Sequence, residues 1–334
     1  MRYELLGICL ALTAFLAVNA IVSMASSLGW RALSPWTQRW SAKARAEVLF
    51  ALRIAAPAVA FVFVALFLLP SYVGYEPRGT SEVVGIKLAV LALLSAFGAG
   101  FALHRACRSY LATRALRRQW LATATQIQLP GIDVPTFRIP HSFPIIAVVG
   151  TLRPRLFVAN QVLQSISPEE LAAAIAHERG HLIAHDNLKR VLLRACRDAL
   201  MIFPSGRSLD REWSETAEAA ADEYVAQASP TMALDLASAL VTIARMIPKG
   251  THVELPLAAF LVGDETRGVK ARVRRLLELA STNAEARSKT LLVERTLPLV
   301  VVALLIAASA AFALNSSVLL GVHSIVEHIV SILC

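Results

Sequence analysis

Charged residues are scarce in this chain, and so are cysteines. Lysine, arginine, aspartate and glutamate make up 17% of the 334 residues, whereas 56% are hydrophobic. A soluble globular chain carries about 25% charged and about 45–50% apolar residues, so this composition favours a membrane protein with one soluble domain. The four cysteines have no paired spacing, which excludes a disulfide framework and a cysteine zinc site. The sequence also lacks internal repeats and low-complexity segments.

Four apolar runs predict membrane-spanning helices. They cover residues 5–28, 54–72, 83–103 and 296–314. Each has roughly the 20 residues that a helix needs to cross a bilayer. The first run exceeds the apolar core of a secretory signal, about 7–15 residues, so it is interpreted as a retained helix. The apolar tail, residues 318–334, is interpreted as an external amphipathic helix.

Basic residues are distributed unevenly between the predicted connections. Residues 30–53, predicted to be a polar loop, carry five of them, whereas residues 72–82 carry Arg78 alone. Five arginines follow the third span, in a segment 105–125 predicted to form a helix along the membrane. Lysine and arginine concentrate on cytoplasmic loops. We therefore predict a multi-pass protein of the inner or plasma membrane, with an external N-terminus and a cytosolic soluble domain. The net charge of +9 then mostly sets orientation, and no nucleic-acid partner is expected.

One stretch of the soluble part predicts a metal-binding helix. Ser167, Pro168 and Glu170 give the start of a helix with a capping box, which we expect to run on to about residue 203. His177 and His181 are four residues apart and leave the same face of this helix, so both can bind one zinc ion. Glu178 follows the first histidine directly, where a carboxylate can take a proton from zinc-bound water.

A third metal ligand must come from elsewhere, because a catalytic zinc site has three protein ligands and one open position. The helical stretch 213–225 supplies Glu218, with Glu215 competing one turn earlier. Asp222 shares the face of Glu218 and can hold the far nitrogen of one zinc-bound histidine.

Further polar residues lie near the second histidine of the motif. Asp186 is expected to support the site from behind. His185 is either an alternative ligand or solvated, and the solvated alternative is favoured because Glu218 already fills the usual ligand set. Tyr224, His185 and an arginine remain candidates for the oxyanion or substrate contact.

These residues resemble a known group of peptidases. The resemblance rests on Gly150-Thr-Leu-Arg-Pro-Arg-Leu156, Ser167-Pro-Glu-Glu-Leu171, His177-Glu-Arg-Gly-His181 with Asp186, and Glu218-Ala-Ala-Ala-Asp222-Glu223. It is to the membrane metallopeptidases of the BlaR/MecR sensor-transducers and, more distantly, to the HtpX and Ste-type CAAX prenyl proteases. Ala221 departs from the cysteine common in BlaR/MecR-type proteins and matches the HtpX and CAAX branch. The resemblance implies zinc ligands at His177, His181 and Glu218, a catalytic Glu178, and one Zn²⁺ per chain.

The predicted fold is mainly α. We expect an integral membrane protein with about four transmembrane helices and an HExxH, gluzincin-like metallopeptidase domain that contains a small β-hairpin or sheet. The predicted parts are a three-helix membrane region 1–104, a cytosolic peptidase domain 105–296, and a last transmembrane helix with a short tail, 297–334. Residues 145–149 and 156–159 predict the hairpin, whose edge either pairs with an extended substrate or is purely structural.

Three functions follow from this interpretation. The BlaR/MecR resemblance implies regulated cleavage of a protein or peptide substrate such as a repressor, with a separate sensor protein supplying the signal. The HtpX resemblance implies quality control of membrane proteins instead. The third alternative is a non-catalytic, zinc-stabilised membrane sensor or scaffold, which the intact Glu178 disfavours because a structural zinc site needs no general base.

Overall fold

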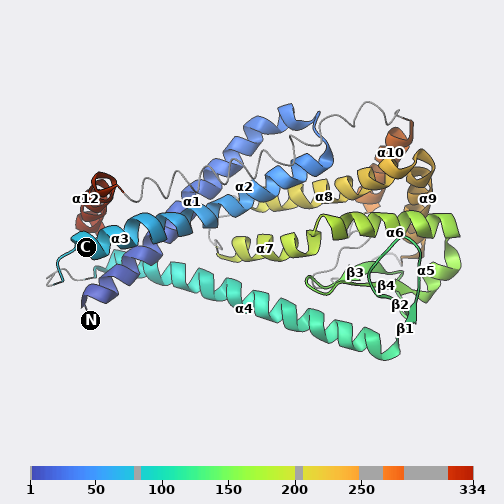
Figure 1. Ribbon diagram of the computed structural model, residues 1–334, viewed down its shortest axis with the longest axis horizontal. Helices are drawn as coiled ribbons and strands as arrows, with labels where there is room; N and C mark the ends of the chain where they lie inside the picture. Colours follow the sequence, from blue (N-terminus) through green and yellow to red (C-terminus); the bar gives the residue numbers. More distant parts are fainter. Residues whose placement is uncertain (1, 79–83, 200–205, 248–265, 282–314, 334) are drawn as a thin grey trace.

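The computed structural model describes residues 2–78, 84–199, 206–247, 266–281 and 315–333. Its N-terminal part consists of three long helical rods (Figure 1). The first is α1 (Arg2–Thr37); the second runs through α2 (Ala42–Phe63), the π-helical turn η1 (Val64–Leu68) and α3 (Leu69–Tyr75); the third is α4 (Ile86–Thr123). By length and composition, each of these rods could cross a membrane. The first three predicted spans are therefore confirmed, and the fourth, 296–314, lies outside the described residues.

The predicted polar loop 30–53 is wrong, because this segment is almost entirely helical. Only the turn 38–41 separates α1 from α2, and the side chain of Ser41 accepts a hydrogen bond from the Ala44 N–H to cap α2. Alanine, lysine and arginine are good helix formers, so nothing ends the helix where the apolar run stops. A helix does not have to end where an apolar run gives way to charged residues.

The same reasoning corrects the segment 105–125, which does not form a separate helix. It continues the third span without a break, and α4 is one straight helix of 38 residues in Figure 1. No proline interrupts α4, and its far end carries Trp120 into the core of the soluble domain, where the indole packs 5.1 Å from the ring of Phe157.

The soluble domain contains a four-stranded sheet in the order β1-β2-β4-β3. The strands are β1 (Thr125–Ile127), β2 (Thr136–Ile139), β3 (Ile146–Val149) and β4 (Arg155–Ala159). β3 and β4 pair antiparallel as the predicted hairpin, and β2 adds parallel to β4. Gly150 has φ 108° after β3, a left-handed conformation that glycine adopts without strain. β3 is an edge strand of this sheet.

Helices enclose the sheet and build the core. They are α5 (Asn160–Ser165), α6 (Pro168–Ile183), α7 (Asp186–Ala199), α8 (Gly206–Ala228), α9 (Pro230–Met246) and α10 (Thr266–Ser281). Buried aliphatic side chains of β3 and β4 pack with residues of α6 and α9 in one apolar cluster. α8 packs against both α6 and α2, and it therefore lies between the core of the soluble domain and the N-terminal rods.

The predicted helix through residue 203 is wrong, because α6 ends at Ile183 and α7 begins at Asp186. His185 has φ 55°, a left-handed conformation that an α-helix cannot contain. The break turns the chain just after the second histidine of the motif. Its consequence is that Asp186 points back at His181.

The tail forms α12 (Ser316–Leu333), which packs against α3 at the end of the molecule that is distant from the sheet (Figure 1). The Ser71 hydroxyl donates to the Leu319 carbonyl oxygen at 2.9 Å, and Val330 is buried in a cluster with Tyr72 and Leu6. The helical part of the tail prediction therefore agrees with the structure, and its external location stays a prediction.

Candidate metal centre

The motif helix α6 begins as its sequence predicts. The Ser167 side chain accepts from the Glu170 N–H at 3.2 Å, and the Glu170 carboxylate accepts from the Ser167 N–H at 2.9 Å. This reciprocal capping box fixes the first turn of the helix. Two turns later, His177, Glu178 and His181 face the interior and are almost completely buried.

His177 and His181 from α6 and Glu218 from α8 form a group that can hold a metal ion. The two Nε2 atoms are 3.1 Å apart, and the Glu218 carboxylate oxygens lie 3.5 Å from His177 Nε2 and 3.6 Å from His181 Nε2. Ligand atoms about 2.0–2.1 Å from a tetrahedral zinc ion are separated by about 3.3 Å. These separations are compatible with one metal ion shared by the three side chains.

Each histidine is oriented by a carboxylate on its other ring nitrogen. His177 Nδ1 lies 3.0 Å from Asp222 Oδ1, and His181 Nδ1 lies 2.6 Å from Asp186 Oδ2. Such contacts orient the ring so that Nε2 faces the metal position, and they increase the basicity of the ring. The structure thus brings both aspartates to the positions that the sequence predicts.

The electrostatics of the site favour a positive charge between these ligands. Burial alone would lower the pKa of His181, but the Glu218 and Asp186 carboxylates outweigh it and raise this pKa to about 10. Burial would raise the pKa of Asp222, yet Arg272 and His177 hold it at about 2. For Glu218, too, the charges of His181 and Arg272 and hydrogen bonds from both histidines outweigh burial and hold the pKa well below its usual value. Ionised carboxylates around two imidazoles are a suitable environment for a divalent cation.

Glu178 has a different environment from the ligands. Its Oε2 accepts a hydrogen bond from the Val148 N–H of strand β3 at 3.2 Å, and Oε1 is buried without a hydrogen-bond partner among the described residues. Burial raises the pKa of this carboxyl group, against the lowering effect of His181 and His177. A carboxylate with a raised pKa and one unpaired oxygen is suited to accept a proton.

The two ligand-bearing helices approach each other closely at Gly180. A Cβ atom at this position would lie 3.2 Å from the Cα atom of Ala221. Glycine on α6 and alanine on α8 therefore allow the backbones to meet where the ligands must converge. Tyr224, one turn after Ala221, is half-buried beside the same contact.

Arg272 is a site residue that the sequence interpretation missed. It lies on α10, and its side chain is only 14% exposed. Its Nη2 is 2.6 Å from Asp222 Oδ1 and its Nε is 3.0 Å from Asp222 Oδ2, a bidentate pair. Its Nη1 is 3.3 Å from Glu218 Oε2. In the sequence, nothing distinguishes this arginine from its neighbours Lys270 and Arg274.

Arg190 of α7 was missed as well. Its Nη2 donates to Glu218 Oε1 at 3.0 Å, so two guanidinium groups hold the third ligand from different helices. Because α6 breaks at His185, α7 approaches α8 at an angle that the sequence did not indicate.

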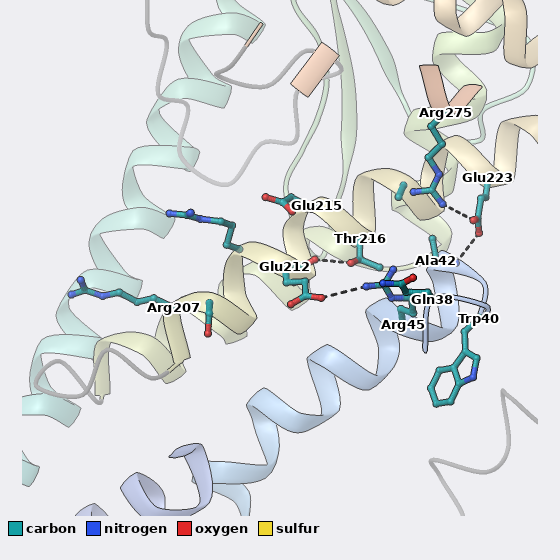
Figure 2. A pocket seen from close by; sticks show the side chains of 13 residues that line it. Gln38, Trp40, Ala42, Arg45, Arg207, Glu212, Glu215, Thr216, Glu223 and Arg275 are labelled. Atoms are coloured by element: carbon teal, nitrogen blue, oxygen red, sulfur yellow. Dashed lines mark hydrogen bonds and ion pairs between the residues drawn. The ribbon is translucent and has the colours of Figure 1, made fainter. Parts of the chain in front are cut away.

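The other candidates lie outside the ligand group. Glu215 lines a hollow of about 770 Å³ that is separate from the ligand group. Its charged lining residues include Arg207, Arg211 and Arg275. In Figure 2, Glu215 stands beside Thr216 and Glu212, and Arg275 reaches Glu223. His185 is exposed at the break after α6 and lines a cleft of about 390 Å³ that contains Glu178 and His181.

Comparison with known proteins finds similarity over the part of the chain that contains the candidate metal centre. Residues 112–255 match the model of peptidase family M48. The predicted resemblance to HtpX-like membrane metallopeptidases is confirmed. The matched residues contain all three candidate ligands and Glu178, whereas Arg272 lies beyond them.

Several curated proteins named Protease HtpX match the same part of the chain. The chain is 32% identical over 142 residues to those of Escherichia coli O1:K1, Escherichia coli K12 and Shigella boydii serotype 18. The aligned part makes up 38% of this chain and 47% of each relative. The chain therefore spans about half the length of the curated relatives it matches. The prediction of a metalloendopeptidase is confirmed at the level of this domain.

Proposed function

We propose that this protein is a zinc-dependent membrane endopeptidase that cleaves extended protein segments. The observation that carries the proposal is the convergence of His177, His181 and Glu218 beside a buried, proton-accepting Glu178. A zinc ion held by these ligands would act as a Lewis acid toward water and the scissile carbonyl group. Glu178 accepts a proton from the attacking water and returns it to the leaving amine.

Strand β3 supports this function as a docking edge for the substrate. The Ala159 N–H donates to the Ile145 carbonyl oxygen, so alternate residues of β3 pair with β4 and Val148 directs its N–H and C=O away from it. Both groups of Val148 face the cleft that contains Glu178. An extended peptide that adds to this edge has its backbone fixed next to the catalytic carboxylate.

The rim of the cleft favours substrates with apolar side chains. Leu152 is 88% exposed, Ile183 52% and Leu188 42%, and all three line the cleft. Exposed apolar side chains around a docking edge suit unfolded or membrane-protein segments better than the surface of a folded repressor. This rim favours the quality-control alternative over BlaR/MecR-like signalling through a separate sensor. Together, the docking edge and the apolar rim favour catalysis over a scaffold.

Metal removal tests the proposed chemistry. Detergent-solubilised protein should cleave an unfolded protein, lose this activity on treatment with a zinc chelator, and recover it when zinc is added back, because the ligand set matches zinc. Cleavage is followed on gels and metal content by atomic absorption. Undiminished cleavage by demonstrably metal-free protein would contradict the proposal.

The orientation of the chain is tested separately. A reporter fused after Gly206 should be cytosolic and one fused at Gly79 external, because the basic connections lie on the side of the soluble domain. Enzymatic reporters that are active only on one side of the membrane measure this. Reversed signals would place the catalytic domain outside and rule out every cytosolic substrate.

A further inference from the structure

We propose that Asn187 covers the substrate-docking edge of β3 and must be displaced when a peptide binds. The inference rests on the proposed function, since it concerns the same cleft. It assigns to Asn187 the place that the backbone of an extended substrate would take.

The contacts of Asn187 reproduce those of a paired strand. Its Nδ2 donates to the Val148 carbonyl oxygen at 3.0 Å and to the Gly150 carbonyl oxygen at 3.1 Å. The backbone N–H and C=O of Val148 point away from β4. Gly150 is two residues further on, so by the same alternation its carbonyl group points away from β4 too. The N–H of Val148 is taken by Glu178. Side chains thus occupy the backbone positions that an added peptide would use.

These contacts leave the amide of Asn187 incompletely satisfied. Its Oδ1 is buried and has no hydrogen-bond partner among the described residues. A buried acceptor without a partner is unfavourable. In this position of the Asn187 side chain, it offsets part of the stabilisation that the two hydrogen bonds contribute. Such an arrangement is suited to exchange with a ligand that satisfies the edge fully.

The location of Asn187 allows this exchange without disturbing the metal ligands. Asn187 is the second residue of α7, directly after Asp186, which holds His181. A rotation of the Asn187 side chain frees the carbonyl oxygens of Val148 and Gly150, while the backbone and Asp186 stay in place. The alternative is a static role, in which Asn187 fastens the hairpin to α7 and is needed for peptide binding.

The two alternatives predict opposite signs for peptide affinity. The experiment measures binding of a fluorescent, extended apolar peptide to the Glu178→Gln protein, which separates binding from cleavage. Adding Asn187→Ala should tighten binding by about fivefold to tenfold, because two modest hydrogen bonds need no longer be broken. Asn187→Asp has nearly the same shape but no N–H to donate, so it should tighten binding too. Asn160→Ala, an asparagine of α5 outside the cleft, is the matched control and should leave affinity unchanged.

Unchanged or weaker binding in both Asn187 variants, with unaltered thermal unfolding, would overturn the proposal, as would the absence of peptide binding at any concentration. The proposed function fails on a different readout, namely the absence of cleavage by the wild-type protein. A peptide that binds more tightly after Asn187→Ala to a protein that cleaves nothing would support the role of Asn187 and reject the endopeptidase.

Discussion

The Glu178→Gln protein should cleave peptide bonds at least about a hundredfold more slowly than the wild type, the low end of what general acid–base catalysis contributes. Glutamine keeps the size and polarity of the side chain, and its carbonyl oxygen can still accept the Val148 N–H. It cannot take up the proton of the attacking water. Zinc content and thermal stability should change little, because the ligands are untouched.

The measurement compares initial rates on an unfolded protein in detergent or liposomes, with zinc determined on the same samples. Glu169→Gln is the matched control, since Glu169 is exposed on the same helix, away from the ligands. Equal, robust cleavage by wild type and Glu178→Gln would remove Glu178 from the mechanism. If neither protein cleaves any substrate, yet Glu178→Gln disrupts signalling in cells, the scaffold alternative gains support.

Replacing Glu218 with alanine should remove most of the bound zinc. The change deletes one of three ligands, and it leaves Arg190 and Arg272 next to the metal position without the carboxylate that they contact. Two imidazoles facing two guanidinium groups are a poor cation site. Zinc per chain, measured after dialysis, should fall from about one to near zero.

Glu215→Ala is the control for this experiment, because Glu215 is the neighbouring carboxylate that competed with Glu218 in the sequence. It lines the hollow shown in Figure 2 and should keep its zinc. If Glu215→Ala loses zinc while Glu218→Ala retains it, the third ligand is misassigned.

The parts of the site that depend on local spacing could be predicted from the sequence. Two histidines four residues apart on a capped helix share a face whatever surrounds them, and Glu218 and Asp222 are related in the same way. The hairpin was predictable as well, because two short apolar runs flank a glycine-containing turn.

The parts that depend on tertiary contacts could not be predicted. Arg272 reaches Asp222 across 50 positions of sequence, and the pattern around it is that of any amphipathic basic helix. The left-handed backbone of His185 is rare for a non-glycine residue, so the sequence favoured an unbroken helix. That one torsion aims Asp186 at His181 and brings Arg190 to Glu218.

The helix that carries Glu218 and Asp222, α8, also packs against α1 and α2. Arg53 of α2 pairs with Asp210 at 3.1 Å, and Trp30 of α1 is buried against Trp213. Glu223, the residue after Asp222, accepts the Ala42 N–H at the first turn of α2 at 2.8 Å. A change in tilt of α1 or α2 therefore reaches the metal ligands through one rigid element. Because a membrane-spanning helix can tilt to fit the thickness of its bilayer, a bilayer around α1 and α2 would then influence the geometry of the candidate metal site.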